Sequence, residues 1–356
     1  MHLRRLSPFP RHALLGLGLV FLATTARAQF IPYFGKNKVT YENLTWRVYK
    51  SPHFEIYYYP EFEQHLARMS SYAESAYQKV SSELKHEINR PIPLILYKTH
   101  TEFEQTNLFP SFLPEGVAAF AEPTRGRMVL PIDEPPDQLQ GLVTHELTHI
   151  FEFDMIPRGL VQRGVPLWLD EGLADYMRGI WEPLDLMSLR DAAVTDQIPR
   201  ITRFEDYGNL SNPRLVYNLG HAVFEFIEAK YGKEGIRQFL YTFRKTFVGG
   251  GKEDIYEQAF RMKPEEFDDA FDKWLKERFK AFRDKDRPSD YGRDIAPHSE
   301  KTHYTQVFAF SPSPSGEVIA AITGNRAEGE ADVVLLSARD GAILRNLTAG
   351  YTGAFE

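Results

Sequence analysis

The pattern of hydrophobic and polar positions changes its period twice along the chain. Between residues 45 and 132, short apolar runs rich in β-branched and aromatic residues alternate with turn residues, which is typical of strands. One longer segment in this region repeats its apolar residues at helical spacing. The pattern predicts two strands within 45–59, a helix over 61–85, a strand at 91–98, a short helix at 101–107 and a hairpin over 116–132.

The pattern then becomes helical as far as residue 283. It predicts helices separated by Gly and Pro, at 138–153, 167–179, 184–193, 214–231, 233–247, 253–261 and 265–283. We expect Asp137 to cap the N-terminus of the first of these helices, because Pro135 and Pro136 should block an earlier start.

Residues 303–348 return to strands, with four short apolar runs separated by turn signals. The stretches "FSPSPSGEVIAAIT" and "DVVLLSARDGAILRNLT" resemble a blade of the TolB-type, WD40-like β-propeller family. The resemblance implies that residues 300–356 are the first blade of a propeller. Because one blade cannot bury both its faces, we expect the sequence to be the front part of a longer protein.

The N-terminus has the features of a secretory signal. Arginines at positions 4, 5 and 11 precede an apolar run from Ala13 to Ala23, and Ala26-Arg27-Ala28 is a small-x-small cleavage pattern. We therefore expect residues 1–28 to be removed and the protein to be exported, to a bacterial periplasm or outside the cell. The alternative is a short membrane anchor, although the apolar run is brief for a span; no later stretch is long enough to cross a bilayer.

Composition narrows the chemistry further. The 356 residues are 43% hydrophobic and 13% aromatic, which is globular, and they include no cysteine. The fold therefore cannot rest on disulfides, and any metal must be held by His, Asp or Glu. The net charge of −7 argues against a nucleic-acid partner.

The stretch "VTHELTHIFEF" (143–153) carries the first chemical signal. Residues four apart lie on one face of a helix, so His145 and His149 can direct their imidazole nitrogens at one zinc ion, with Glu146 beside that point. An ordinary helix that contains two histidines is the alternative interpretation.

A second predicted helix, "PLWLDEGLADYMRG" (166–179), has acidic residues among apolar ones. Such carboxylates are costly to bury without partners, and a zinc ion with its histidines would supply them. We interpret Glu171 as the third metal ligand and Asp175 as the acceptor of a ligand histidine's outer N–H. Asp170 is a weaker candidate for the other histidine, and both aspartates have simpler interpretations, as a solvated surface acid or a helix cap.

HELTH (145–149) and "WLDEGLADY" (168–176), with 21 residues between His149 and Glu171, resemble the gluzincin group of zinc metallopeptidases. This group includes thermolysin, the aminopeptidase N type and bacterial MA-like domains attached to propellers. The resemblance implies an α+β domain over residues 29–290, with an N-terminal mixed sheet and a helical C-terminal half. It implies one Zn²⁺ per chain and assigns the same roles to Glu171 and Asp175. The metzincin pattern fails, because it needs Gly at 152 and His at 155, where the chain has Glu152 and Met155.

The same resemblance assigns two further residues. Aminopeptidase-type gluzincins have Tyr-x-x-Gly at the start of a helix, whose phenol donates to the tetrahedral oxyanion, and Tyr217 and Gly220 match it. His221 is the alternative donor, as in thermolysin-like enzymes. Both residues can also be interpreted as packing or supporting groups.

The hairpin residues Gly116, Val117, Ala118 and Ala119 are expected to bind the substrate backbone as an added strand. The family's aminopeptidases have a glutamate in this hairpin that binds the free amine of the substrate. This chain has no acidic residue at the matching position, and Glu122 is only a distant alternative.

The sequence as a whole predicts zinc-dependent hydrolysis of peptide bonds in a peptide or protein substrate, and an endopeptidase before an aminopeptidase. Glu146 is expected to activate a zinc-bound water, with Tyr217 or His221 as the oxyanion donor. The alternative is a catalytically inactive scaffold that binds a protein partner through its propeller.

Overall fold

The computed structural model describes residues 43–106, 108, 117–156, 165–203, 214–246, 254–283, 285, 295, 302–327 and 330–350. These residues form two compact units that meet in the chain between Met155 and Ile156. The predicted signal at 1–28 lies outside the described residues.

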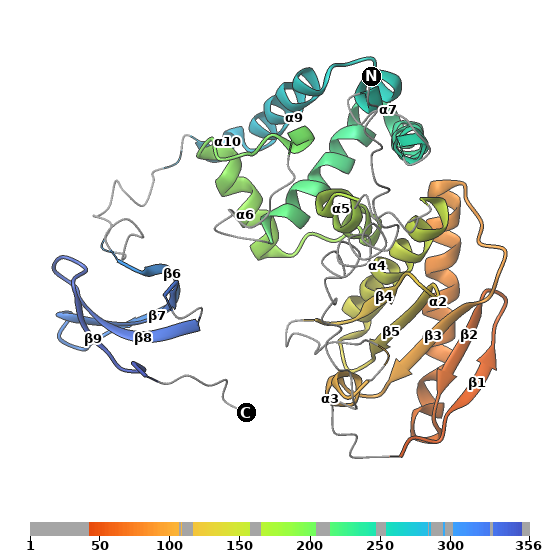
Figure 1. Cartoon of the computed structure of the whole chain (residues 1–356), viewed down its shortest axis with the longest axis horizontal. Helices are drawn as coiled ribbons and strands as arrows, with labels where there is room; N and C mark the ends of the chain where they lie inside the picture. The colour runs from red at the N-terminus through yellow and green to blue at the C-terminus, as the bar shows by residue number, and fades with distance from the viewer. Residues whose placement is uncertain are drawn as a thin grey trace, which may run out of the picture. The chain divides into compact units, whose positions relative to one another are not determined.

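The first unit is built on a five-stranded mixed sheet (Figure 1). Its strand order is β1-β2-β3-β5-β4, where β2, β3 and β5 are parallel and the two outer strands are antiparallel to their neighbours. The strands are β1 (Arg47–Lys50), β2 (Phe54–Tyr58), β3 (Ile92–Tyr97), β4 (Phe120–Glu122) and β5 (Arg127–Pro131). The predicted strands and hairpin are confirmed, and β4 lies at an edge of the sheet.

Both faces of this sheet are covered. On one face, Ile56, Leu94 and Met128 lie in register on neighbouring strands and are fully buried. Helices α2 (Glu63–Leu84) and α4 (Pro136–Met155) pack on the sheet and on each other in this layer. On the other face Phe103 of α3 (His100–Glu104) packs against Val129. The alternation of strand side chains between faces produces the two separate layers.

Helix α4 begins earlier than the sequence predicts. Pro136 occupies its first position, and the first helical hydrogen bond runs from Leu139 N to Pro135 O. The prediction that Asp137 caps this helix is therefore wrong; Asp137 lies inside the first turn. A proline is tolerated there because the N–H that it lacks has no partner within a helix.

The second unit is helical before it becomes a sheet. Its long helix α7 (Leu215–Thr246) is kinked at Gly232, which has a φ of 68°. The kink separates the two helices that the sequence predicts at 214–231 and 233–247. Aromatic rings form much of the core, for example Phe267 with Phe226, Tyr256 and Phe260 at centroid distances of 4.9–5.4 Å. The other helices are α5 (Leu167–Arg178), α6 (Pro183–Val194), α8 (Asp254–Phe260), α9 (Pro264–Arg278) and α10 (Lys280–Arg283).

The C-terminal part is a sheet of four antiparallel strands in sequence order. They are β6 (Tyr304–Pro312), β7 (Val318–Asn325), β8 (Glu330–Ser337) and β9 (Ile343–Asn346). The four strands are confirmed, whereas their membership in a propeller stays a prediction. In the part of the chain that the structure describes, no helix combines the length and the apolar character that a bilayer span requires.

A half-buried carboxylate, that of Glu74, joins α2 to the turn between β1 and β2. Glu74 accepts hydrogen bonds from the Ser51 hydroxyl at 2.6 Å, the His53 backbone N–H at 3.0 Å and His53 Nδ1 at 2.6 Å. Burial by itself would raise the pKa of Glu74, but the hydrogen bonds from His53 and Ser51 outweigh it and lower that pKa.

Replacing Glu74 by Gln should therefore destabilise the protein in a pH-dependent way. A carboxylate with a lowered folded-state pKa stabilises the fold above its unfolded pKa, and this contribution is lost as the pH falls through the folded value. We expect the variant to lose about 1–2 kcal/mol at pH 7 in urea unfolding, and the loss to shrink as the pH drops below about 4. Glu87→Gln, at an exposed position, is the control; an equal loss at pH 7 and in acid would contradict this account.

Candidate metal centre

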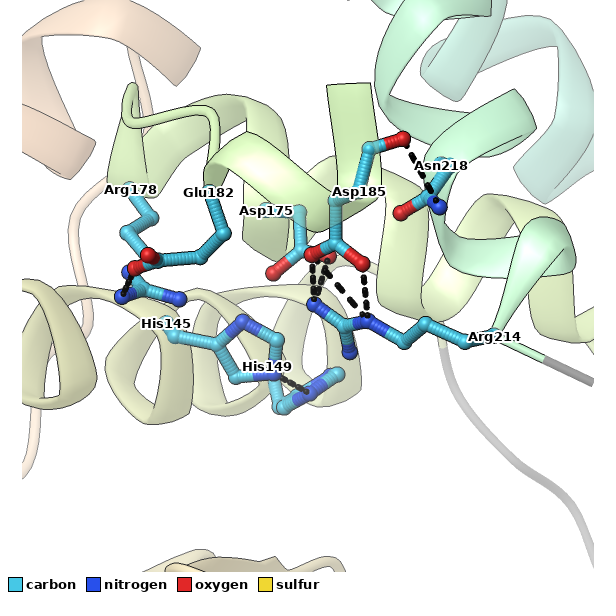
Figure 2. Close-up of polar contacts among 8 residues, drawn as sticks. All are labelled: His145, His149, Asp175, Arg178, Glu182, Asp185, Arg214 and Asn218. Carbon is cyan, nitrogen blue, oxygen red and sulfur yellow. Dashed lines mark hydrogen bonds and ion pairs between the residues drawn. The ribbon is translucent and has the colours of Figure 1, made fainter. Parts of the chain in front are cut away.

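The two histidines of α4 face each other as two ligands of one ion would. Their Nε2 atoms lie 3.3 Å apart and their rings are nearly perpendicular, at 79° (Figure 2). Two nitrogens that each lie 2.0–2.1 Å from a tetrahedral zinc ion are separated by about 3.3–3.4 Å. The observed separation therefore fits a shared ion. His149 is buried and His145 is half-buried, so the pair opens toward solvent on one side.

Glu146 follows His145 on α4 and is only 5% exposed. Helix spacing brings it about one-third of a turn round from His145, beside the line of the two imidazoles. A carboxylate that is buried to this extent needs polar or charged neighbours to remain ionised.

The acidic residues of the second motif all lie on α5. Glu171 and Asp170 are half-buried there, and Asp175 is buried. Two imidazole nitrogens and a carboxylate oxygen are a donor set that suits zinc.

Helix α5 is locked to α7 by two glycines. A Cβ atom on Gly220 would lie 1.9 Å from the Trp168 carbonyl oxygen, and one on Gly172 would lie 2.4 Å from the Gly220 backbone. No side chain fits between these backbones, so the helices cross at van der Waals contact. Gly172 follows Glu171 directly, and Gly220 lies one turn after Tyr217, so the crossing fixes these two residues relative to each other.

Tyr217 lies in the first turn of α7 and is half-buried. Burial, together with the negative charge of Glu171, raises the pKa of Tyr217 to about 12, against the opposing effect of Arg214. The phenol is therefore protonated at neutral pH and can act as a hydrogen-bond donor. The influence of Glu171 on this pKa places the phenol within electrostatic reach of the predicted metal ligand.

His221 lies one turn further along α7, in aromatic surroundings. It is 4% exposed, and its ring stacks on Trp181 at a centroid distance of 4.1 Å and an interplanar angle of 8°. Burial lowers the pKa of His221 to about 4, although Glu225 opposes this shift. Its Nε2 lies 3.8 Å from Glu225, which accepts a hydrogen bond from the Trp181 indole at 2.9 Å. These contacts describe a neutral, packed imidazole.

Asp175 has a partner that the sequence analysis missed. Arg214, just before α7, donates from Nη2 to Asp175 at 3.3 Å and to Asp185 at 2.9 Å, with Nε at 3.2–3.3 Å from the Asp185 oxygens (Figure 2). Its guanidinium carbon lies 4.7 Å from the centre of the Tyr217 ring. The only sequence signal was its place three residues before Tyr217, on the same side of a helix start. The predicted role of Asp175 beside a ligand histidine stays a prediction.

The hairpin is described from residue 117 onward, so Gly116 lies outside the described residues. Val117 is half-buried, Ala118 is exposed and Ala119 is buried, just before the edge strand β4. Glu122, at the end of β4, accepts the backbone N–H groups of Thr124 and Arg125 at 2.8 and 3.2 Å. It also pairs with Arg127 Nε at 3.1 Å.

A sequence profile of the Peptidase MA superfamily matches residues 72–277, which is more than half of the chain. The chain belongs to this superfamily. Its matched region runs from α2 to α9 and includes both histidines, Glu171 and Tyr217. No curated protein matches the chain.

Membership in the Peptidase MA superfamily supports a peptidase-like protein with a peptide or protein substrate, in a family whose members are typically metal-dependent. It covers the domain that the sequence predicts from the HELTH and WLDEGLADY motifs. The match ends before the C-terminal strands, so it says nothing of a propeller.

The glycine contact between α5 and α7 gives a stability test. We expect Gly220→Ala to destabilise the protein by about 1–3 kcal/mol, because the new methyl group would meet the backbone of Trp168. Thermal unfolding of the full chain measures the effect. Ala229→Ser adds one atom at an exposed position of the same helix and should leave the melting temperature unchanged; equal effects of the two substitutions would argue against the close contact.

Proposed function

We propose that the protein is a zinc-dependent endopeptidase of the Peptidase MA superfamily. The 3.3 Å separation of the two imidazole nitrogens carries this proposal, because it equals the spacing of two nitrogens bound to one tetrahedral zinc ion. The half-buried carboxylate of Glu171 on α5 would complete the donor set.

His145, His149 and Glu171 would hold one Zn²⁺, with neutral imidazoles and an ionised carboxylate. When bound, the ion supplies a Lewis acid that polarises the scissile carbonyl and makes water more acidic. Three protein ligands leave one coordination position open, as a catalytic zinc site requires.

The remaining chemistry falls to residues of this chain. The Glu146 carboxylate, beside the histidines, takes a proton from the attacking water and returns it to the leaving nitrogen. The Tyr217 hydroxyl, protonated at neutral pH, donates a hydrogen bond to the oxygen that develops negative charge. We favour Tyr217 over His221 for this role, because the His221 ring stacks on Trp181 and its Nε2 faces Glu225.

The hairpin supports endopeptidase rather than aminopeptidase action. Recognition of a free amine would need a carboxylate with room for it, and Glu122 is already engaged by its own turn and by Arg127. The strand β4 lies at an edge of the sheet, which is the position at which a substrate strand can be added. We propose that residues 116–119 and this edge bind the substrate backbone.

We also propose the cellular location and the domain organisation that the sequence predicts. Residues 1–28 would direct export to the periplasm or outside a bacterial cell. Residues 29–290 would form the peptidase domain, and residues 300–356 would form a first propeller blade that contributes to binding a protein partner. The antiparallel order β6-β7-β8-β9 is that of a propeller blade, which supports the last assignment.

The metal and Glu146 can be tested together. We expect the purified full chain to contain about one zinc per chain by elemental analysis. It should cleave peptides that are N-acetylated and C-amidated. Glu146→Gln should retain the zinc and lose at least about a hundredfold in kcat, because the substitution removes the proton acceptor. His149→Ala should lose the zinc.

Glu87→Gln, on the surface, is the matched control and should behave as wild type. Full activity of Glu146→Gln would contradict the mechanism. Absence of stoichiometric zinc in a folded wild-type protein would instead favour an inactive scaffold. Cleavage restricted to peptides with a free amine would contradict the endopeptidase assignment.

The two oxyanion-donor candidates are separable by kinetics. We expect Tyr217→Phe to lower kcat by about 10²–10³ with little change in KM, because the donated hydrogen bond forms only as charge develops. His221→Gln should affect the melting temperature more than kcat. The reverse pattern would assign the donor to His221.

A further inference from the structure

We propose that Arg214 is a positioning residue that holds the Tyr217 ring in its working orientation and acts on catalysis only through that ring. The proposal rests on the proposed function, in which Tyr217 is the oxyanion donor. Arg214 lies outside both sequence motifs, and its role emerges from contacts within the second unit.

The Arg214 guanidinium is fixed from two helices. Asp185 of α6 binds both Nε and Nη2 at 2.9–3.3 Å, and Asp175 of α5 accepts from Nη2 at 3.3 Å. The Asp175 and Asp185 side chains are 7% and 15% exposed. Asn218, the residue after Tyr217, donates to the Asp185 backbone carbonyl at 3.2 Å. The group therefore ties α5, α6 and the start of α7 together (Figure 2).

This fixed plane lies against the Tyr217 ring. The guanidinium carbon is 4.7 Å from the ring centre, within the range of a cation–π contact. A planar cation that is anchored by two carboxylates restrains the ring from one side. The plane is specific to arginine, because a lysine ammonium is a point charge without a flat surface.

Direct recognition of a substrate carboxylate is the competing role for Arg214, whose side chain is 41% exposed. The local charge argues against it. Asp175 and Asp185 together outweigh the single positive charge of Arg214. An incoming carboxylate would meet net negative charge.

A double-mutant cycle on the zinc-loaded full chain tests the proposal. Arg214→Met and Arg214→Lys should each lower kcat by about ten- to hundredfold with KM little changed, because the donor is misplaced. In a Tyr217→Phe background, the same substitutions should change kcat by less than about twofold, since the hydroxyl that they misplace is already gone. Arg178→Met, which removes the ion pair between Arg178 at the end of α5 and Glu182 before α6, is the control and should behave as wild type.

A second measurement does not depend on activity. Nitration of tyrosines by tetranitromethane, read by peptide mass spectrometry, should proceed several-fold faster at Tyr217 in Arg214→Met than in wild type. Tyr241, exposed on α7, is the internal control and should react equally in both proteins. If Arg214→Met does not fold, the nitration of Tyr217 can be measured in Arg214→Lys, which retains the positive charge between Asp175 and Asp185.

The outcomes separate the two hypotheses. Wild-type protein without zinc-dependent cleavage overturns the proposed function, while the nitration result still decides whether Arg214 covers the ring. In an active enzyme, an equal loss of kcat with and without the Tyr217 hydroxyl overturns the positioning role. A rise in KM that is the same in the Tyr217→Phe background would assign Arg214 to substrate binding and would also overturn it.

Discussion

The contact between the backbones of α5 and α7 is the constraint on which the candidate centre depends. At Gly172 and Gly220 the helices approach so closely that a single methyl group would collide with a carbonyl oxygen. Backbone contacts of this kind are stiffer than side-chain contacts, because they leave no rotamer to adjust. Glu171 and Tyr217 each lie within one turn of the crossing, so their separation is set by two helix axes rather than by loops.

Charge organises the rest of the centre. Helix α5 carries three carboxylates among apolar residues, which would repel one another without compensation. Arg214 balances one of them together with Asp185. The proposed zinc ion would compensate the negative charge near Glu171. Burial, together with the negative charge of Glu171, raises the pKa of the Tyr217 phenol further above neutral pH, so the site would hold its donor and its acid–base carboxylate in different protonation states.

Most of the secondary structure was predictable, because its signals are local. Strands in 45–59, the helix after them and the β4–β5 hairpin follow from apolar periodicity and turn residues within the segment itself. The start of α4 was predicted wrongly, since the Pro135-Pro136 pair was interpreted as a barrier and Pro136 instead occupies the first helical position. The motif residues His145 and His149 were predictable from helix spacing, and their facing nitrogens agree with that prediction.

The sequence by itself determined the ligand types, the helix that carries the two histidines and the acidic helix that follows, because each depends on residues a few positions apart. Only the tertiary structure decided the contacts between distant segments: the glycine crossing of α5 with α7, the stacking of His221 on Trp181 and the anchoring of Arg214 by Asp175 and Asp185. The two carboxylates that anchor Arg214 lie 39 and 29 positions before it in the chain. No local periodicity encodes such contacts, since they depend on how whole helices pack.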